Sequence, residues 1–246
     1  MRFALLTSHL AERVRGRDHR DVTHVFDAPQ DALSYADRVA RTVPMYRDVH
    51  RMATILMAEH APEDARILVL GAGGGLETKA FAEARPGWTF DAVDPAAAML
   101  DLAVKTLEPH ASRVRFHHGY IDDAPPGPFA AATSLLTLHF LAPDERLRTA
   151  AAVRQRLSPG APYVVVHASI PHRDDAERAL WMRRHRANVV ASGVDPADAD
   201  RMITVVNDEV PVLTPAQDRT ILEQAGFTDV TEFFSAFIFR GWVGYA

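Results

Sequence analysis

The stretch Ile67-Leu68-Val69-Leu70-Gly71-Ala72-Gly73-Gly74-Gly75 decides the fold class of this chain. Its four aliphatic residues predict a buried strand, and the glycines at 71, 73 and 75 allow a tight turn into a helix that begins near Leu76. A plain strand-to-helix turn needs only one or two glycines. Three at alternate positions, next to the free N–H groups of a helix N-terminus, favour a backbone that a ligand approaches closely.

A carboxylate follows the next predicted strand. Asp94 stands nineteen residues after Gly75, where it can accept hydrogen bonds from both ribose hydroxyls of a nucleotide. The competing interpretation is a helix N-cap before Pro95, and one residue can serve both purposes. A dinucleotide fingerprint needs glycine where Leu76 stands, so the G-x-G-x-G spacing favours S-adenosylmethionine over NAD as the cofactor.

Short apolar runs alternate with helical patterns along the chain, which predicts βαβ units around a parallel sheet. Strands are expected at 67–70, 89–93, 114–118, 130–136 and 163–168, followed by two antiparallel strands within 230–245. Before these final strands, Thr214 and Gln217 flank Pro215 and predict a capped helix that ends at Gly226.

Composition limits the possible functions. The 246 residues include no cysteine, and 27 basic against 32 acidic residues give a net charge of −5. Thiol catalysis and cysteine-held metal sites are therefore excluded, and a reducing, cytoplasmic setting is expected. Apolar runs end well before the roughly 20 residues of a membrane span, so no membrane contact is expected. The mild acidity also argues against nucleic acid as a partner.

With these motifs the chain resembles the class I S-adenosylmethionine-dependent methyltransferases. The resemblance runs from residue 67 to the C-terminus and includes the glycine loop, Asp94, the turn at 157–160 and the turn at 225–227. It implies a Rossmann-like α/β fold with a seven-stranded, mostly parallel sheet in the order 3-2-1-4-5-7-6 and helices on both faces. The donor would lie across the C-terminal ends of the first two strands.

A narrower similarity, at 26–27, 41–46, 137–143 and 234–241, is to the carboxy-S-adenosylmethionine synthase branch. It implies a tyrosine near the donor, Tyr46, and a lid arginine for the donor's extra carboxylate, for which Arg201 is the nearest candidate. It also implies a homodimer, for which the aromatic final strands could supply the interface, or they could form a core face. The chain departs from the branch in having Val69, Tyr120, Leu135 and His139 where other residues are usual.

We expect one domain, 1–246, in four parts: an arm and helical cap (1–62), a donor-binding core (65–169), a lid insertion (170–212), and a last helix with closing strands (213–246). In the lid, the segment 181–186 is expected to form a helix over the donor pocket. Its Arg183 and Arg184 either select an anionic acceptor or form a solvated helix face.

These motifs and the resemblance predict a binding site for the methyl donor. Its members share a place at the C-terminal ends of the strands or in the cap: Tyr46, Gly71, Ala72, Gly73, Gly75, Asp94, Pro95, Met99, Tyr120, Ile121 and Leu135.

Methyl transfer requires mainly that an acceptor be held in line with the sulfonium, so a base is optional. His139 is the candidate base, and a surface histidine at a turn is the competing interpretation. No metal is expected, because no histidines share ligand spacing with a carboxylate. The sequence therefore predicts a methyltransferase that acts on a small-molecule acceptor. The alternatives are an enzyme that carboxylates the donor and a noncatalytic protein that binds it.

Overall fold

The computed structural model describes residues 32–246, with side chains from residue 36 onward. The expected arm at 1–25 and the motif at 26–27 lie outside the described residues. Within them, one seven-stranded sheet has the order β3-β2-β1-β4-β5-β7-β6, which confirms the predicted fold. Only β7 runs antiparallel to its neighbours, β5 and β6. The strands are β1 Arg66–Leu70, β2 Thr89–Asp94, β3 Val114–His118, β4 Ala131–Leu135, β5 Pro162–Ala168, β6 Thr228–Ala236 and β7 Phe239–Tyr245.

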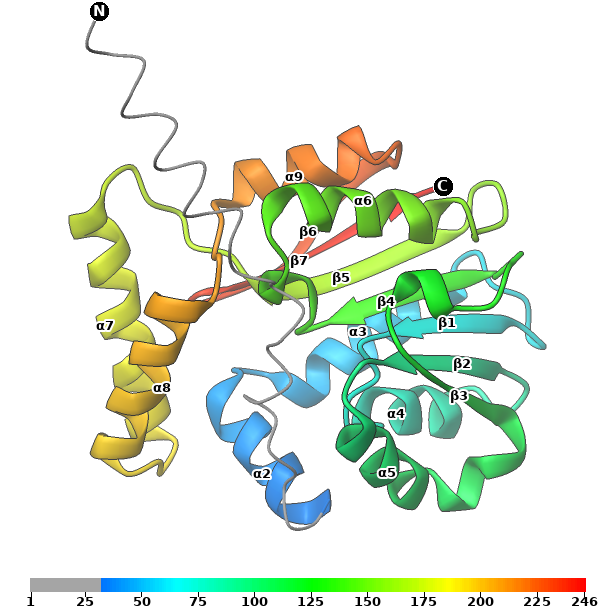
Figure 1. The fold of residues 1–246 in the computed structure, drawn as a ribbon, viewed down its shortest axis with the longest axis horizontal. Helices are drawn as coiled ribbons and strands as arrows, with labels where there is room; N and C mark the ends of the chain where they lie inside the picture. Colours follow the sequence, from blue (N-terminus) through cyan, green and yellow to red (C-terminus); the bar gives the residue numbers. More distant parts are fainter. Residues whose placement is uncertain (1–31) are drawn as a thin grey trace, which may run out of the picture.

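Helices cover both faces of the sheet (Figure 1). Ile67 and Val69 of β1 belong to a hydrophobic cluster on one face, and Leu68 and Leu70 belong to the cluster on the other. This two-sided burial explains why β1 is continuously aliphatic rather than alternating. The first face packs against α3 Tyr46–Ala58, α4 Leu76–Ala84 and α5 Ala97–Thr106, and the second against α6 Pro143–Arg154 and α9 Pro215–Gln224.

The helix α9 begins and ends as the sequence predicts. Thr214 and Gln217 form a reciprocal capping box around Pro215 at the first helical position. Just past the helix, Gly226 has a φ of 95°, a conformation that favours glycine. Three short 3₁₀ segments complete the connections of the core: η2 Glu108–Arg113, η3 Ile121–Asp123 and η4 Leu138–Phe140.

In the described part of the chain, three helices stand outside the two layers, at the left and lower left of Figure 1. They are α2 Ala32–Thr42, α7 Asp175–Ala191 and α8 Pro196–Glu209. One helix was expected in the insertion, but the structure has an antiparallel pair. Each begins at an aspartate whose carboxylate accepts a backbone N–H, Asp174 from Glu177 and Asp195 from Ala197. Those caps explain why this acidic segment divides into two helices.

Of the two aromatic final strands, β7 is buried on both faces, whereas β6 is the edge strand of the sheet. Because β7 lies between β5 and β6, its Trp242 is only 1 % exposed and Phe239 only 6 %. These side chains are therefore buried within the chain and leave no apolar surface on β7 for a partner.

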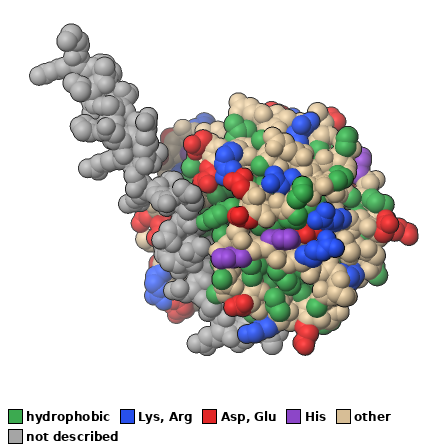
Figure 2. Space-filling model, turned by 45° about the vertical axis from the view of Figure 1, so that its right-hand side comes forward, with side chains coloured by type: hydrophobic (Ala, Val, Ile, Leu, Met, Phe, Trp, Pro, Cys, Tyr) green, Lys and Arg blue, Asp and Glu red, His purple; other side chains and the backbone are tan. Residues whose placement is uncertain are grey.

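The molecular surface carries no dominant charge on the face that Figure 2 displays, where acidic and basic side chains are interspersed among uncharged ones. Within residues 32–246, no helix is long and apolar enough to cross a membrane. Across the same residues, no three histidine, aspartate or glutamate side chains are grouped so that they could hold a metal ion.

Candidate functional site

A cavity of about 420 Å³ lies where the parallel strands end. Its floor consists of the residues that follow β1, β2, β3 and β4, and its walls come from α2, α7, α8 and the turn between β6 and β7. Carboxyl ends of parallel strands beside a topological switch are the usual ligand position in open α/β sheets. The lid helices and the strand ends therefore enclose one shared space.

The glycine loop is held against the neighbouring strand. The backbone N–H groups of Gly71 and Ala72 both donate to the carbonyl of Val93, at 2.8 and 3.0 Å. Gly71 has a φ of 81°, and a Cβ built there would lie 2.0 Å from the hydroxyl oxygen of Thr137. Since no side chain fits at this position, the loop presents bare backbone to the cavity.

Asp94 joins this loop to the start of α5. One carboxylate oxygen accepts the N–H of Gly73 at 2.8 Å, and the other accepts the N–H of Ala96 at 2.9 Å. Burial raises the pKa of Asp94 above its usual value, against the effect of these two hydrogen bonds. Each oxygen can accept one further hydrogen bond. The carboxylate therefore orders the loop and lines the cavity, but it is not the N-cap of α5, which is Ala96. Its contact with a ribose stays a prediction.

Most of the predicted donor residues lie together. Those that line the cavity are Tyr46, Gly71, Ala72, Gly73, Asp94, Pro95, Met99, Tyr120, Ile121 and Leu135, together with the candidate base His139. Gly75 and Arg201 are the two that lie elsewhere.

Gly75 has a packing role instead. It has a φ of 80° at the N-cap of α4, and an added Cβ would lie 3.1 Å from the Cα of Ala103 and 3.0 Å from Leu107. The expectation that a ligand lies against all three alternate glycines is therefore wrong for this one. Its small size lets α4 approach α5.

Arg201 points away from the cavity. Its side chain is 72 % exposed and forms an ion pair with Asp198, one turn earlier on α8. The structure therefore does not bring this guanidinium to the donor, because the face of α8 that lines the cavity carries Met202, Ile203 and Val206.

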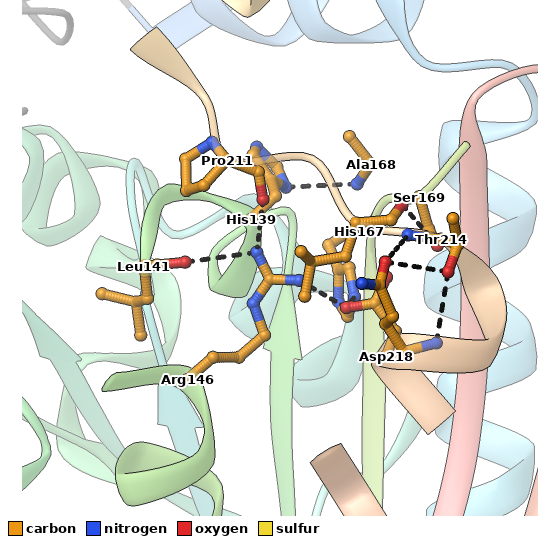
Figure 3. A network of polar contacts seen from close by, with 11 residues as sticks. His139, Leu141, Arg146, His167, Ala168, Ser169, Pro211, Thr214 and Asp218 are labelled. Atoms are coloured by element: carbon orange, nitrogen blue, oxygen red, sulfur yellow. Dashed lines mark hydrogen bonds and ion pairs between the residues drawn. The ribbon is translucent and has the colours of Figure 1, made fainter. Parts of the chain in front are cut away.

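His139 is buried, at 8 % exposure, so the interpretation as a surface histidine is wrong. Its Nδ1 accepts a hydrogen bond from the backbone N–H of Ala168 at 3.3 Å (Figure 3). The neutral ring therefore carries its proton on Nε2. Burial lowers the pKa of His139 well below its usual value, and the charges of His167 and Arg146 lower it further. The ring is thus suited to donate a hydrogen bond rather than to take up a proton.

A buried ion pair lies behind His139 (Figure 3). Arg146 on α6 donates to the carboxylate of Asp218 on α9, and His167 Nε2 lies 3.1 Å from the same carboxylate. Burial alone would raise the pKa of Asp218, but the charges and hydrogen bonds of these neighbours lower it below its usual value. Arg146 also donates to the carbonyl oxygens of Leu141 and Pro211, at 3.2 and 3.1 Å. One guanidinium thus ties the segment after α8 to the loop after η4.

The sequence analysis missed further ionisable cavity residues, of which two are deeply buried. Glu77 on α4 is 6 % exposed, and its carboxyl accepts a hydrogen bond from Thr133 at 3.2 Å. His185 on α7 is 3 % exposed, and burial lowers its pKa to about 4, so the ring is neutral at pH 7. A glutamate two residues after the glycine loop was a usable signal, whereas the inward face of α7 depends on tertiary packing.

The wall formed by the lid helices is almost entirely apolar. Besides neutral His185 and, from α2, the polar side chains of Arg38 and Thr42, the cavity residues from the cap, the lid and the final turn include Val39, Val43, Val189, Ala199, Met202, Ile203, Val206, Val210, Ile238 and Phe239. The cavity therefore has a polar floor at the strand ends and a largely apolar roof.

This fold and cavity define the class of protein: a Rossmann-like domain of the class I methyltransferase type, with a ligand cavity over the glycine loop. A family profile described as "Methyltransferase domain" matches residues 67–160. The chain is 26 % identical to the carboxy-S-adenosyl-L-methionine synthase of Pseudomonas fluorescens, over 83 % of this chain and 86 % of that protein. It is 29 % identical to the synthase of Campylobacter lari, over 57 % of this chain and 59 % of that protein.

Among solved structures, an O-methyltransferase family protein from Burkholderia thailandensis shares the fold, with a TM-score of 0.61 and 17 % identity. The match covers 82 % of this chain and 55 % of the Burkholderia protein, so the chain spans about half the length of that protein. Together these findings show a match to a methyltransferase domain at residues 67–160 and the class I methyltransferase fold over most of the chain.

Proposed function

We propose that this protein transfers the methyl group of S-adenosylmethionine to a small, uncharged, largely apolar acceptor. One observation carries the proposal: a single cavity joins the glycine loop and Asp94 to the apolar wall of α2, α7 and α8. The donor supplies an electrophilic methyl group when it is bound. The enzyme's main task is then to hold the acceptor in line with that group and to exclude water.

The residues of the floor fit the donor's adenosine. Asp94 offers two carboxylate oxygens toward the ribose, and Tyr120 and Ile121, which follow β3, offer apolar surface for the adenine ring. In this proposal 170–212 acts as the lid and α2 as the cap, so their apolar side chains surround the acceptor. A charged acceptor would lose its hydration against these apolar side chains, among which Arg38 of α2 is the charged group.

His139 and neutral His185 are buried polar residues of the cavity, one from the η4 segment and one from α7. His139 can donate a hydrogen bond to an acceptor oxygen. His185 can accept one, because its low pKa leaves the ring unprotonated at pH 7. They are proposed to orient an acceptor that has a hydroxyl or carbonyl group.

A second candidate function, synthesis of carboxy-S-adenosylmethionine, is supported by the names of the curated relatives. Against it, Arg201 lies outside the cavity, so the donor's extra carboxylate would lack this cation. Mass spectrometry of the ligand released from purified protein distinguishes the two. Methyl transfer predicts S-adenosylmethionine or S-adenosylhomocysteine, and a sulfonium heavier by one carboxylate would overturn our proposal.

A further inference from the structure

The methionine end of S-adenosylmethionine carries an α-ammonium group, and the cavity must compensate that charge when it removes the group from water. This inference rests on the proposed function, since it concerns how the donor is held. Three acidic side chains line the cavity: Glu77, Asp94 and Glu145. Their hydrogen-bond and ion-pair partners differ, and this difference indicates which carboxylate binds the ammonium group.

Two of these carboxylates already have partners that compensate their charge. Both oxygens of Asp94 accept backbone N–H groups, from Gly73 and Ala96. Glu145 lies at the cavity edge with 26 % of its side chain exposed, and its Oε1 is 3.8 Å from the guanidinium of Arg148. The negative charge of each of these two carboxylates is therefore compensated by a neighbouring group even when no donor is bound.

Glu77 is buried without a cation beside it. Within the part of the chain whose side chains are described, no ion pair involves Glu77, and its hydrogen-bond partner is the hydroxyl of Thr133. Burial raises the pKa of Glu77 well above its usual value. The negative charge of Asp94 adds to this rise, against the effect of the hydrogen bond from Thr133. A buried carboxyl of this kind, facing a cavity, is set up to gain from a ligand cation.

The strand order places Glu77 at the right end of the donor. Asp94 ends β2 and Tyr120 follows β3, so an adenosine held there extends the rest of the donor toward β1 and β4. Thr133 on β4 is in register with Val69 on β1, two residues before Gly71. The carboxyl bonded to Thr133 therefore lies beside the glycine loop, over β1 and β4.

We propose that the carboxylate of Glu77 binds the α-ammonium group of the donor. The residue is a binding and positioning residue, since it acts on the end of the donor away from the transferred methyl group. A cation beside the carboxylate favours its ionised form, so donor binding should release a proton from Glu77.

The test is calorimetric titration with S-adenosylhomocysteine and with its analogue lacking the α-amino group. Each is titrated into the full chain and into Glu77→Gln, which keeps an oxygen for Thr133. Glu83→Gln is the matched control, because it makes the same change on the same helix at a side chain that is 56 % exposed. Repeating the titrations in buffers of different ionisation enthalpy measures the protons released on binding.

We expect Glu77→Gln to weaken S-adenosylhomocysteine binding by about 10- to 100-fold, the effect of losing one charge-assisted hydrogen bond. Affinity for the des-amino analogue should be unchanged, proton release should disappear, and Glu83→Gln should match the wild type. Equal weakening of both ligands would assign Glu77 a purely structural role and overturn the inference, as would undiminished affinity or undiminished proton release. If the wild type fails to bind S-adenosylhomocysteine at all, the proposed function itself fails.

Discussion

Replacing Arg146 by methionine should destabilise the protein far more than its position on the surface helix α6 would suggest. The side chain is 1 % exposed, and that of its partner Asp218 is fully buried. The substitution leaves a buried carboxylate with His167 beside it and removes the hydrogen bonds to the carbonyl groups of Leu141 and Pro211. Methionine fills a similar volume, so the loss reports on charge and hydrogen bonding rather than on a cavity.

The expected loss in the free energy of unfolding follows from the burial of the Arg146–Asp218 pair. Removing one partner of a buried ion pair costs about 3 to 5 kcal/mol, which lowers the melting temperature of a chain of this size by about 6 to 20 °C. Arg148→Met is the matched control, two residues later on the same helix. Arg148 pairs with Asp122, but their side chains are 50 % and 68 % exposed, so this change should cost at most about 1 kcal/mol.

The assay is urea unfolding followed by circular dichroism at pH 7, with thermal melts as a second measure. The double variant Arg146→Met/Asp218→Leu should regain part of the lost free energy of unfolding, because it removes the unpaired buried carboxylate. Equal, small losses for Arg146→Met and Arg148→Met would show that the buried pair does not hold α6 to α9, and the reasoning from burial would fail.

Gly71→Ala should abolish S-adenosylhomocysteine binding in calorimetry because of the clash with Thr137, whereas Gly160→Ala, with a φ of 74° and nothing within 4 Å of the added carbon, should still bind. Asp94→Asn should weaken the same binding by about tenfold or more, and unchanged affinity would refute the ribose assignment. Burial lowers the pKa of His50 to about 4, and in the unfolded chain its pKa is about 6.5. The unfolded state therefore binds the extra proton between these values, and stability should fall by about 1.4 kcal/mol per pH unit as pH drops from 6.5 to 4. Urea unfolding of His50→Gln across that range should show a shallower slope, and an unaltered slope would contradict this origin.

The sequence was sufficient for the parts of the fold that depend on local pattern. Continuous aliphatic runs such as 67–70 located the central strands, and the glycine spacing with Asp94 located the floor of the cavity. Gly75 was misassigned because the reason for its small size lies in Ala103 of α5 and Leu107 just after that helix, more than 25 residues away in the chain.

The lid illustrates what the sequence could not supply. Which face of α8 turns inward depends on its packing against α7 and the core, so Arg201 could not be oriented from spacing alone. Glu77 looked like an ordinary acidic residue in the first turn of a helix. Its burial and its bond to Thr133, 56 positions later, arise only when β4 is placed beside β1.

The position of β7 also determines at what point during synthesis the sheet can be completed. Strand β5 pairs along its whole length, residues 162–168, with residues 239–245. A ribosome must therefore translate through residue 245 before β5 gains its second neighbour, and until then that edge offers unpaired N–H and C=O groups to other chains. Newly made polypeptide is thus open to faulty association until this strand is inserted.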